Sequence, residues 1–450
     1  MSYDTALASM FALGHELAQT PSHKFDLEHM RVLLTRMDHP ERMFPSVLIA
    51  GTNGKGSTAA TLASILRASG LRAGLYTSPH LIRINERIRI NDETIADDDF
   101  ARIHGEVDRV AEKLVASREL PWHSSFFEMM TAIAFSHFAR EHVEIAVLEV
   151  GMGGRLDATN VVEPLVSVIA DVSLDHQKFL GNTVGEIARE KAGIIRRGGV
   201  VVTLPQQPEA NDVIGNAILD LEAVGVNAVP YVPPVSPNST EYRVPSTERG
   251  VGSRYPLEIL GRQILVETPL AGRHQLRNIA LAIATAVELQ KTKFPGITAE
   301  SIERGIRETN WPGRFQVIPA TTGSPEIILD VAHNPAGAWA LRSALSERYD
   351  ERPVIFVFGA MRDKAIAEMA EILFPLAERV IATRPENPRA SSPEEIREAA
   401  KRASSDIELV SDVKAALDRA RKTAGNRAVV VVTGSIYLVG EAMKFLELRP

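Results

Sequence analysis

The sequence predicts an α/β fold with two domains: a large N-terminal domain with a parallel sheet and a small β subregion, and a smaller, Rossmann-like C-terminal domain. Two observations predict this class. Short, continuous apolar runs recur along the chain, and such runs are typical of parallel strands buried on both faces. Segments with helical periodicity lie between them, and strands that alternate with helices at this spacing form doubly wound sheets.

The first series of elements extends from residue 46 to residue 308. Its predicted strands are 46–50, 73–76, 145–150, 165–170 and 200–203. Its predicted helices are 57–69, 128–139, 182–192, 275–289 and 299–308.

The pattern changes between Pro205 and Pro269. Prolines recur there, at positions 208, 230, 233, 234, 237, 245 and 256, and they disfavour a long helix. Residues 255–266 alternate between apolar and polar side chains, as in an antiparallel strand. We therefore expect a small β-rich subregion in this part of the chain.

A second α/β series follows the segment Trp311-Pro312-Gly313, whose Pro-Gly pair is typical of a boundary. Its predicted strands are 326–330, 354–358, 380–382 and 428–433, with helices at 337–348, 365–373, 393–401 and 412–422. We therefore expect one domain over residues 1–310 and a second over residues 311–450.

The composition of the chain excludes several classes of protein. The absence of cysteine removes disulfides, thiolate metal sites and a cysteine nucleophile. Lys and Arg number 50 against 57 Asp and Glu, and the net charge of −7 argues against sequence-independent binding of nucleic acid. The sequence contains neither a targeting signal nor an apolar run of the ~20 residues that a membrane span needs. We therefore expect a cytoplasmic protein that binds neither nucleic acid nor membrane.

The strongest functional signal is a glycine-rich loop between a predicted strand and a predicted helix, Gly51-Thr52-Asn53-Gly54-Lys55-Gly56-Ser57-Thr58. Glycines let backbone amides turn toward an anion, and the helix start adds a partial positive charge. Lys55 can reach the β- and γ-phosphates of a nucleotide, and a hydroxyl from Ser57 or Thr58 can approach Mg²⁺. The loop departs from the common G-x-x-x-x-G-K-[ST] pattern, because an extra glycine separates the lysine from the serine.

This loop resembles that of the Mur ligase superfamily, and its GKGS ending resembles the folylpolyglutamate synthase/dihydrofolate synthase family within it. Further segments match that family in the same order along the chain. They are TSPHL (77–81), NERI (85–88), FFE (126–128), EVGMGGRLDATN (149–160), DH (175–176), EKAGI (190–194), HQ (274–275) with Asn278, WPGRF (311–315), DVAHNP (330–335), DK (363–364) and TGS (433–435). The resemblance covers nearly the whole chain and implies a P-loop ATPase-like N-terminal domain.

The resemblance implies an ATP-dependent ligase that adds L-glutamate to dihydropteroate, to reduced folates, or to both. ATP would phosphorylate the acceptor carboxylate, and the amine of glutamate would then attack the acyl phosphate. The family's ATP-binding positions correspond to Thr52, Asn53, Gly54, Lys55, Gly56, Ser57, Thr58, Asn278, Arg314 and Asp330. The implied partners are these small molecules, and we expect a monomer.

The implied Mg²⁺ ligands are Ser57, Ser78, Glu149 and His176, with room in the family for two ions. Without the resemblance, His176 would be interpreted as a hydrogen-bonded loop histidine and Glu149 as a cap of the loop after its strand. Lys191 corresponds to a lysine that the family carries carbamylated; a surface helix lysine is the alternative. With Lys55 and His333, Lys191 makes up the implied catalytic set.

The implied contacts to the pterin or folate are Phe126, Phe127, Glu128, Leu156, Asp157 and Ala158. Aromatic faces suit a flat heterocycle, although core packing is the alternative for the two phenylalanines. Phe25-Asp26-Leu27 is a further candidate to cover this pocket. The chain departs from the family at Val331, at Ala365 and at Gln177-Lys178-Phe179, the last beside an implied metal ligand.

Two other functions remain open. A different Mur-type ligase would share the ATP and metal residues and differ in its carboxylate acceptor. A nucleotide-dependent binding protein would keep the loop without ligase chemistry. A dehydrogenase fingerprint at 151–154 is discounted, because the third glycine of G-x-G-x-x-G is absent.

Overall fold

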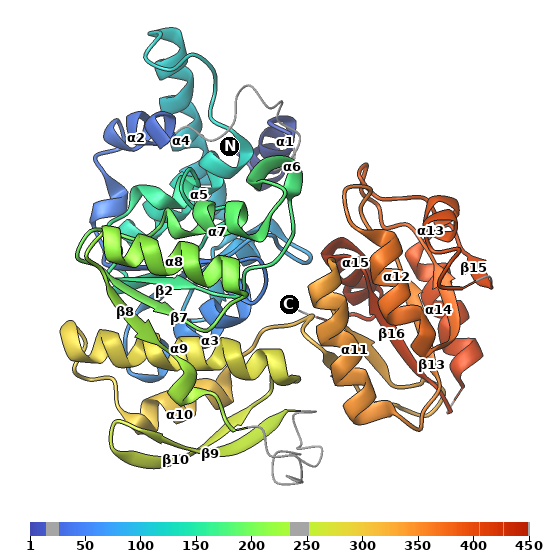
Figure 1. The fold of residues 1–450 in the computed structure, drawn as a ribbon. Helices are drawn as coiled ribbons and strands as arrows, with labels where there is room; N and C mark the ends of the chain where they lie inside the picture. Colours follow the sequence, from blue (N-terminus) through green and yellow to red (C-terminus); the bar gives the residue numbers. More distant parts are fainter. Residues whose placement is uncertain (15–26, 235–251, 405, 426, 449–450) are drawn as a thin grey trace.

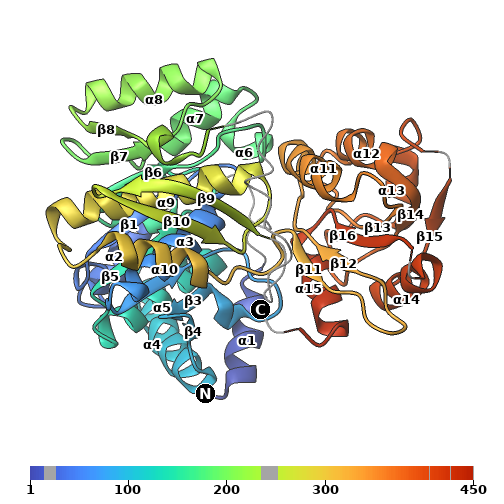
Figure 2. The same ribbon diagram turned by 90° about the horizontal axis from the view of Figure 1, so that it is seen from below.

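The structure is a computed structural model that describes residues 1–14, 27–234, 252–404, 406–425 and 427–448. In these residues two sheets built mainly of parallel strands lie side by side, each covered by helices (Figure 1, Figure 2). The predicted α/β class, with a large N-terminal sheet domain and a separate C-terminal one, is confirmed. Phe25 and Asp26, proposed as a cover of the acceptor pocket, lie outside the described residues.

The N-terminal sheet has eight strands in the order β4-β3-β2-β5-β1-β6-β7-β8. The run from β2 to β8 is parallel, whereas β3 and β4 form an antiparallel edge. The strands are β1 (Ser46–Ala50), β2 (Ala73–Tyr76), β3 (Ile88–Ile90), β4 (Glu93–Thr94), β5 (Ile145–Glu149), β6 (Val166–Ile169), β7 (Val200–Thr203) and β8 (Val224–Asn227).

Both faces of this sheet are buried, as its continuous apolar runs predict. Along β1, Leu48 and Ala50 join one hydrophobic cluster, while Val47 and Ile49 join the cluster on the opposite face. The first face is covered by α1 (Tyr3–Ala12), α2 (Leu27–Thr35), α4 (Asp97–Ala116) and α5 (Phe126–Arg140). The second is covered by α3 (Lys55–Ala68), α9 (Arg273–Thr292) and α10 (Ala299–Glu308). Near β6 and β7 lie α6 (Gln177–Leu180), α7 (Val184–Ala192) and α8 (Pro208–Asp220).

Among the described residues of the predicted small β-rich subregion, a separate two-stranded sheet covers residues 253–268. Pro208 does not prevent a helix but lies in the first turn of α8, where its missing N–H costs nothing, and β8 then joins the large sheet. The single strand predicted over 255–266 is wrong. It is a hairpin of β9 (Ser253–Ile259) and β10 (Arg262–Thr268), because Leu260 and Gly261 both take positive φ, 51° and 73°, and turn the chain.

The C-terminal sheet has six strands in the order β11-β12-β16-β13-β14-β15, and β11 alone among them is antiparallel to its neighbour. The strands are β11 (Gln316–Ile318), β12 (Ile327–Leu329), β13 (Val354–Phe358), β14 (Ala377–Ala382), β15 (Ile407–Leu409) and β16 (Val429–Thr433). The helices are α11 (Pro335–Tyr349), α12 (Ile366–Leu373), α13 (Pro393–Ala399), α14 (Val413–Ala424) and α15 (Ile436–Phe445).

Parallel strands of both sheets have their carboxyl ends at one cavity between the sheets, and this arrangement positions the site. In parallel α/β sheets ligands bind beyond the carboxyl ends of the strands. The residues after β1, β5, β6, β12, β13 and β16 line one shared cavity, described below. Among the described helices, none is both long enough and apolar enough to span a membrane.

His104 on α4 is a buried polar residue that should lower the stability of the N-terminal domain. Its side chain is fully buried, neither ring nitrogen has a hydrogen-bond partner among the described residues, and burial lowers its pKa. We expect His104→Leu to raise the free energy of unfolding by about 1 kcal/mol above neutral pH, because it removes unpaired polar atoms. Chemical denaturation of both proteins measures this difference.

The pH dependence gives a second readout of the same substitution. Because the folded-state pKa of His104 is lower than the ordinary 6.5, the unfolded chain binds more protons below pH 6.5. Wild type should therefore lose stability relative to His104→Leu as the pH falls through this range. A variant less stable than wild type at every pH would contradict the interpretation.

Candidate functional site

The phosphate loop lies at the carboxyl end of β1, the strand between β5 and β6 in the large sheet. Gly54 adopts a φ of 83° directly before α3 begins at Lys55. A Cβ on Gly51 would lie 2.8 Å from the Cβ of Ala170, so the loop passes tightly along the end of β6. The ammonium group of Lys55 donates to the carbonyl oxygens of Gly51 and Thr52, at 3.1 and 3.3 Å. The first turn of α3 lines the cavity, and helix N-termini suit anions.

A cavity of about 460 Å³ lies between the two domains. All predicted site residues except Thr58 line it. They are Thr52, Asn53, Gly54, Lys55, Gly56, Ser57, Ser78, Phe126, Phe127, Glu128, Glu149, Leu156, Asp157, Ala158, His176, Lys191, Asn278, Arg314, Asp330 and His333. Thr58 is fully buried, and its hydroxyl donates to the carbonyl oxygen of Asn278 at 3.3 Å, so it joins α3 to α9 instead.

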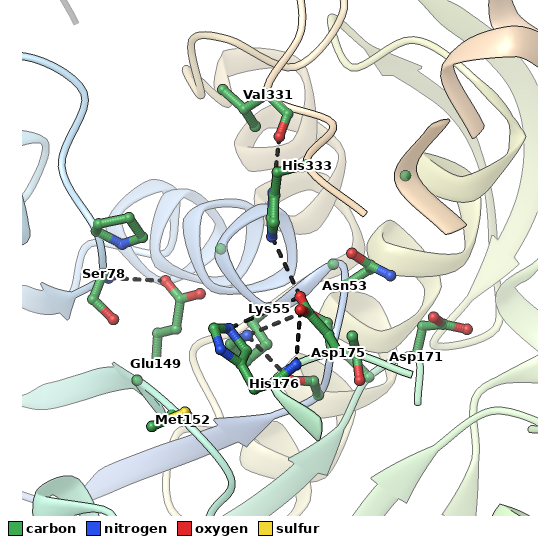
Figure 3. A pocket seen from close by; sticks show the side chains of 18 of the residues that line it. Asn53, Lys55, Ser78, Glu149, Met152, Asp171, Asp175, His176, Val331 and His333 are labelled. Carbon is green, nitrogen blue, oxygen red and sulfur yellow. Dashed lines mark hydrogen bonds and ion pairs between the residues drawn. The ribbon is translucent and has the colours of Figure 1, made fainter. Parts of the chain in front are cut away.

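The four predicted metal ligands offer donors that fit Mg²⁺. Glu149 ends β5, is 5% exposed, and accepts a hydrogen bond from the backbone N–H of Ser78 at 3.2 Å (Figure 3). Burial raises its pKa, and the nearby charge of Lys55 opposes that shift. Burial, reinforced by nearby positive charge, lowers the pKa of His176 to about 3, so its imidazole is neutral and has a lone pair for a metal.

Among the described residues, no three His, Asp or Glu side chains are grouped closely enough to enclose a metal ion by themselves. This does not conflict with magnesium. Mg²⁺ keeps several waters and is commonly held by one or two carboxylates together with substrate phosphates. Glu149, with the hydroxyls of Ser57 and Ser78 at the same cavity, supplies such a donor set.

Lys191 is a buried residue of α7, which excludes the alternative of a surface helix lysine. Its side chain is 3% exposed, and its ammonium group donates to the carbonyl oxygen of Gly51 at 2.8 Å. Burial, together with the like charge of Lys55, lowers its pKa to about 7. A sizeable fraction of this amine is therefore neutral near neutral pH, which makes it nucleophilic.

The opposite wall contains Arg314 and Asp330, which belong to the C-terminal series. Asp330 follows β12, and its carboxylate accepts hydrogen bonds from the backbone N–H groups of Phe315 and Ala332, both at 2.9 Å. Burial raises the pKa of Asp330 and lowers that of Arg314. Asn278 of α9 packs on the phosphate loop, because a Cβ on Gly54 would lie 2.2 Å from its Oδ1.

Comparison with known proteins identifies the family. The Mur ligase middle domain matches residues 49–286, and the Mur ligase glutamate ligase domain matches residues 313–436. The chain is 34% identical over 449 residues to the folylpolyglutamate synthase of Lacticaseibacillus casei, with 99% of each protein covered. It is 32% identical over 426 residues to the dihydrofolate synthase/folylpolyglutamate synthase of Bacillus subtilis, covering 94% and 95% of the two. The chain belongs to the folylpolyglutamate synthase/dihydrofolate synthase family of Mur ligases.

Solved structures agree with this family. The Mycobacterium tuberculosis folylpolyglutamate synthase complexed with ADP and AMPPCP matches with a TM-score of 0.86 at 30% identity, covering 99% of this chain and 100% of that one. Escherichia coli FolC in complex with DHPP and ADP matches with a TM-score of 0.82 at 27% identity, covering 99% and 98%. The prediction of an ATP-dependent ligase of folate metabolism is confirmed.

The two domains of the ligase are joined across the cavity by Asp175, which precedes His176. Its carboxylate accepts a hydrogen bond from the ammonium group of Lys364 at 2.7 Å, and the two side chains are only 9% and 8% exposed. It also accepts from the Asn334 amide at 3.2 Å. The His333 imidazole lies 3.6 Å from the Asp175 carboxylate (Figure 3). Burial would raise the pKa of Asp175, but the His333 hydrogen bond and the nearby positive charges outweigh it and hold the pKa well below its ordinary range.

A second contact between the domains reaches the phosphate loop itself. The amide of Asn334 donates to Oδ1 of Asn53 at 3.0 Å, so one side chain of α11's N-cap touches both the loop and Asp175. Asp175, Asn334 and Lys364 are site residues that were not predicted from the sequence. The signal was present, since DH, DVAHNP and DK are among the family segments, but only the tertiary structure brings them together.

The predicted acceptor wall contains aromatic side chains and two carboxylates with partners of their own. A Cβ on Gly151 would lie 2.5 Å from Cζ of Phe127, so this ring packs directly on the loop after β5. Glu128 accepts from the Ser125 N–H at 2.8 Å, and its other oxygen lies 3.2 Å from Nδ1 of His29. Burial would raise the pKa of Glu128, but the hydrogen bond from His29 lowers it.

Asp157 is also engaged with its own chain. Its oxygens accept from the backbone N–H groups of Met152 and Thr159, both at 3.0 Å, and burial raises its pKa. The carboxylates of the acceptor wall thus hold loops in place as well as lining the cavity.

The departures from the family lie near the site but outside its polar core. Val331 is 6% exposed and joins the hydrophobic cluster beside β12 and β16, and Ala365 caps α12. The segment Gln177-Lys178-Phe179 forms most of the short helix α6 directly after His176, whose φ of 51° turns the chain into that helix.

The buried pair of Asp175 and Lys364 predicts the effect of removing its cation. Lys364→Met leaves a buried carboxylate without its closest counter-ion, a loss that typically costs about 3–5 kcal/mol. We expect the domains to separate, with a larger radius of gyration by small-angle X-ray scattering and loss of activity.

The double variant Asp175→Asn with Lys364→Met is the control, because it removes the uncompensated charge. It should regain much of the compact shape, although not full activity. A Lys364→Met protein with the scattering profile and activity of wild type would contradict the importance of this pair.

Proposed function

We propose that this ligase joins the amine of L-glutamate to the carboxylate of dihydropteroate, of reduced folates, or of both, through an acyl phosphate made from ATP. One observation carries the proposal. The phosphate loop, Glu149 and Lys191 of the N-terminal domain face the same cavity as Arg314, Asp330 and His333. Such a site can hold two reactants and ATP together and exclude water.

The ATP contacts follow from the position of the loop. The amides of residues 52–57 and the side chain of Lys55 bind the phosphates, and Arg314 neutralises phosphate charge from the opposite wall. We assign the ribose to Asp330 and the adenine to Asn278, as in the family pattern. The hydroxyl of Thr58 is engaged with Asn278, so its contribution would be to hold the loop rather than to touch ATP.

Magnesium would be held by Glu149 and by the hydroxyls of Ser57 and Ser78, with His176 as a neutral nitrogen donor and a second ion allowed. When bound, it supplies positive charge against the phosphates. The chain's own residues do the rest. Lys55 and Arg314 orient the γ-phosphoryl group toward the acceptor carboxylate, and His333 lies where that group would transfer.

The proposed reaction has two steps, phosphorylation of the acceptor carboxylate and attack by glutamate. A carboxylate oxygen of the acceptor attacks the γ-phosphorus, and ADP leaves. The neutral amine of glutamate then attacks the acyl carbon, loses a proton, and expels phosphate with that carboxylate oxygen. The net products are the amide, ADP and inorganic phosphate.

The acceptor ring would lie against Phe126 and Phe127, beside Leu156 and Ala158. Glu128 and Asp157 face the same cavity. Glu128 is the better candidate for the amino edge of a heterocycle, because the oxygens of Asp157 already accept hydrogen bonds from Met152 and from the backbone and hydroxyl of Thr159. We propose that residues 1–310 form the domain that binds ATP and the acceptor. Residues 311–450 would form the glutamate-ligase domain, which adds Arg314 and Asp330 to the ATP site.

Lys191 carries the most specific prediction. Its burial and its pKa of about 7 supply the neutral amine that reacts with carbon dioxide, and the resulting carbamate would be an oxygen ligand for a metal. We expect Lys191→Ala to lower turnover by about 100-fold or more without unfolding the protein, because it removes the negatively charged carbamate proposed to hold a metal at the centre of the site. Steady-state kinetics and circular dichroism check both parts.

Carbamylation itself has a separate test. Protein incubated with ¹³C-bicarbonate should give a carbamate signal in ¹³C NMR that is absent from Lys191→Ala, stronger at pH 8 than at pH 6.5 because the amine is then neutral. Near-normal turnover in Lys191→Ala would remove the residue from the mechanism altogether.

The overall function is tested by glutamate-dependent ADP release, measured separately with dihydropteroate and with a reduced folate as acceptor. We expect release with at least one of them, and the ratio distinguishes the two activities. Glu149→Gln should require a higher Mg²⁺ concentration, because it removes a charged ligand. A Mur-type ligase for another carboxylate would respond to neither acceptor, and a nucleotide-binding protein would bind ATP without glutamate-dependent turnover.

A further inference from the structure

Trp311, in the segment between α10 and β11, lies with its ring on the phosphate loop. A Cβ built on Gly56 would be 2.9 Å from Cζ2 of Trp311 and 3.2 Å from its Nε1. Real Cβ atoms do not approach other atoms so closely, so the indole fills the space that any side chain at Gly56 would need. A residue from the linker between the domains therefore covers the loop directly between Lys55 and Ser57.

Two arginines place their guanidinium groups over the indole ring of Trp311. The guanidinium carbon of Arg89, on β3, is 5.7 Å from the ring centroid, and that of Arg314 is 6.0 Å from it. Both distances are within the range of cation–π attraction. Arg89 is 5% exposed, so its position is set by the core, whereas Arg314 lines the cavity. The indole thus lies between Arg89, the phosphate loop and Arg314, the candidate to bind phosphate.

Within the part of the chain that the structure describes, no hydrogen bond to the indole nitrogen holds Trp311 in this position. Its Nε1 is buried and has no partner among the described residues. The ring is consequently positioned by its packing against Gly56 and by the two guanidinium groups. Its location depends on the absence of a side chain at Gly56. This explains the glycine that separates Lys55 from Ser57 and distinguishes the loop from the common pattern.

We propose that Trp311 is a positioning residue that couples the phosphate loop to Arg314 through its contact with Gly56. The loop and the linker arginine then reach their ATP-binding geometry together, because both rest on the same indole. This inference rests on the proposed binding of ATP phosphates by the loop and Arg314. It adds that positions 56 and 311 act as one unit although they are far apart in sequence.

A double-mutant cycle tests this coupling. Gly56→Ala forces a methyl group against the indole, and Trp311→Leu removes the ring. Each substitution should raise KM for ATP and lower kcat, so that kcat/KM falls by about 10-fold or more. The double variant should be more active than Gly56→Ala alone, because leucine leaves room for the methyl group. Trp311→Phe, which keeps a flat ring beside Arg314, should remain near wild type, and thermal unfolding checks that each protein folds.

Fluorescence gives a readout that does not depend on turnover. Trp122 and Trp339 are 40% and 58% exposed, so Trp122→Phe with Trp339→Phe leaves Trp311 as the only tryptophan at little structural cost. Addition of MgADP should change its emission, and the change should be lost when Gly56→Ala is added.

The outcomes separate the two levels of the proposal. If wild type fails to bind MgADP in calorimetry, the proposed ATP site is wrong. If wild type binds MgADP but the losses of Gly56→Ala and Trp311→Leu simply multiply in the double variant, or the emission of Trp311 does not respond, the coupling is wrong and the ATP site stands.

Discussion

A buried ion pair between Asp175 and Lys364 ties the positions of the two domains to each other. Each charge lies almost out of reach of water and finds its counter-ion in the other domain, at 2.7 Å. A buried charge without a partner is strongly unfavourable, so separation of the domains requires both groups to be rehydrated. Asn334 strengthens the connection, because it contacts Asp175 and the phosphate loop at once. The carboxyl ends of strands from both sheets therefore remain at the same cavity.

The electrostatics of that cavity follow from burial as much as from composition. The chain has a net charge of −7, yet Lys55, Arg314 and Lys364 gather at the site where phosphates are expected. Burial lowers the pKa of Arg314, and it lowers the pKa values of Lys191 and His176 to about 7 and about 3. Neutral nitrogen is the form that reacts with carbon dioxide or binds a metal. Desolvation thus favours the uncharged forms of Lys191 and His176, which offer lone pairs.

The sequence predicted the parallel strands well, because a strand buried on both faces is a continuous apolar run. It failed where local signals are ambiguous: Pro208 begins α8 rather than preventing it, and the Leu260-Gly261 turn splits one predicted strand into two. For the site, every residue predicted from the family segments except Thr58 lines the cavity. These segments could not reveal that Lys364 pairs with Asp175 or that Trp311 covers Gly56, because these contacts join residues far apart in the chain and depend on how the domains pack.

In the proposed reaction, the γ-phosphoryl group of ATP activates the acceptor carboxylate before glutamate attacks. Transfer of an isotope tests it most directly. With ¹⁸O in both oxygens of the acceptor carboxylate, one labelled oxygen should appear in the inorganic phosphate released in each turnover, as measured by mass spectrometry. Phosphate that carries no label while the amide is formed would contradict an acyl phosphate and, with it, this account of the site.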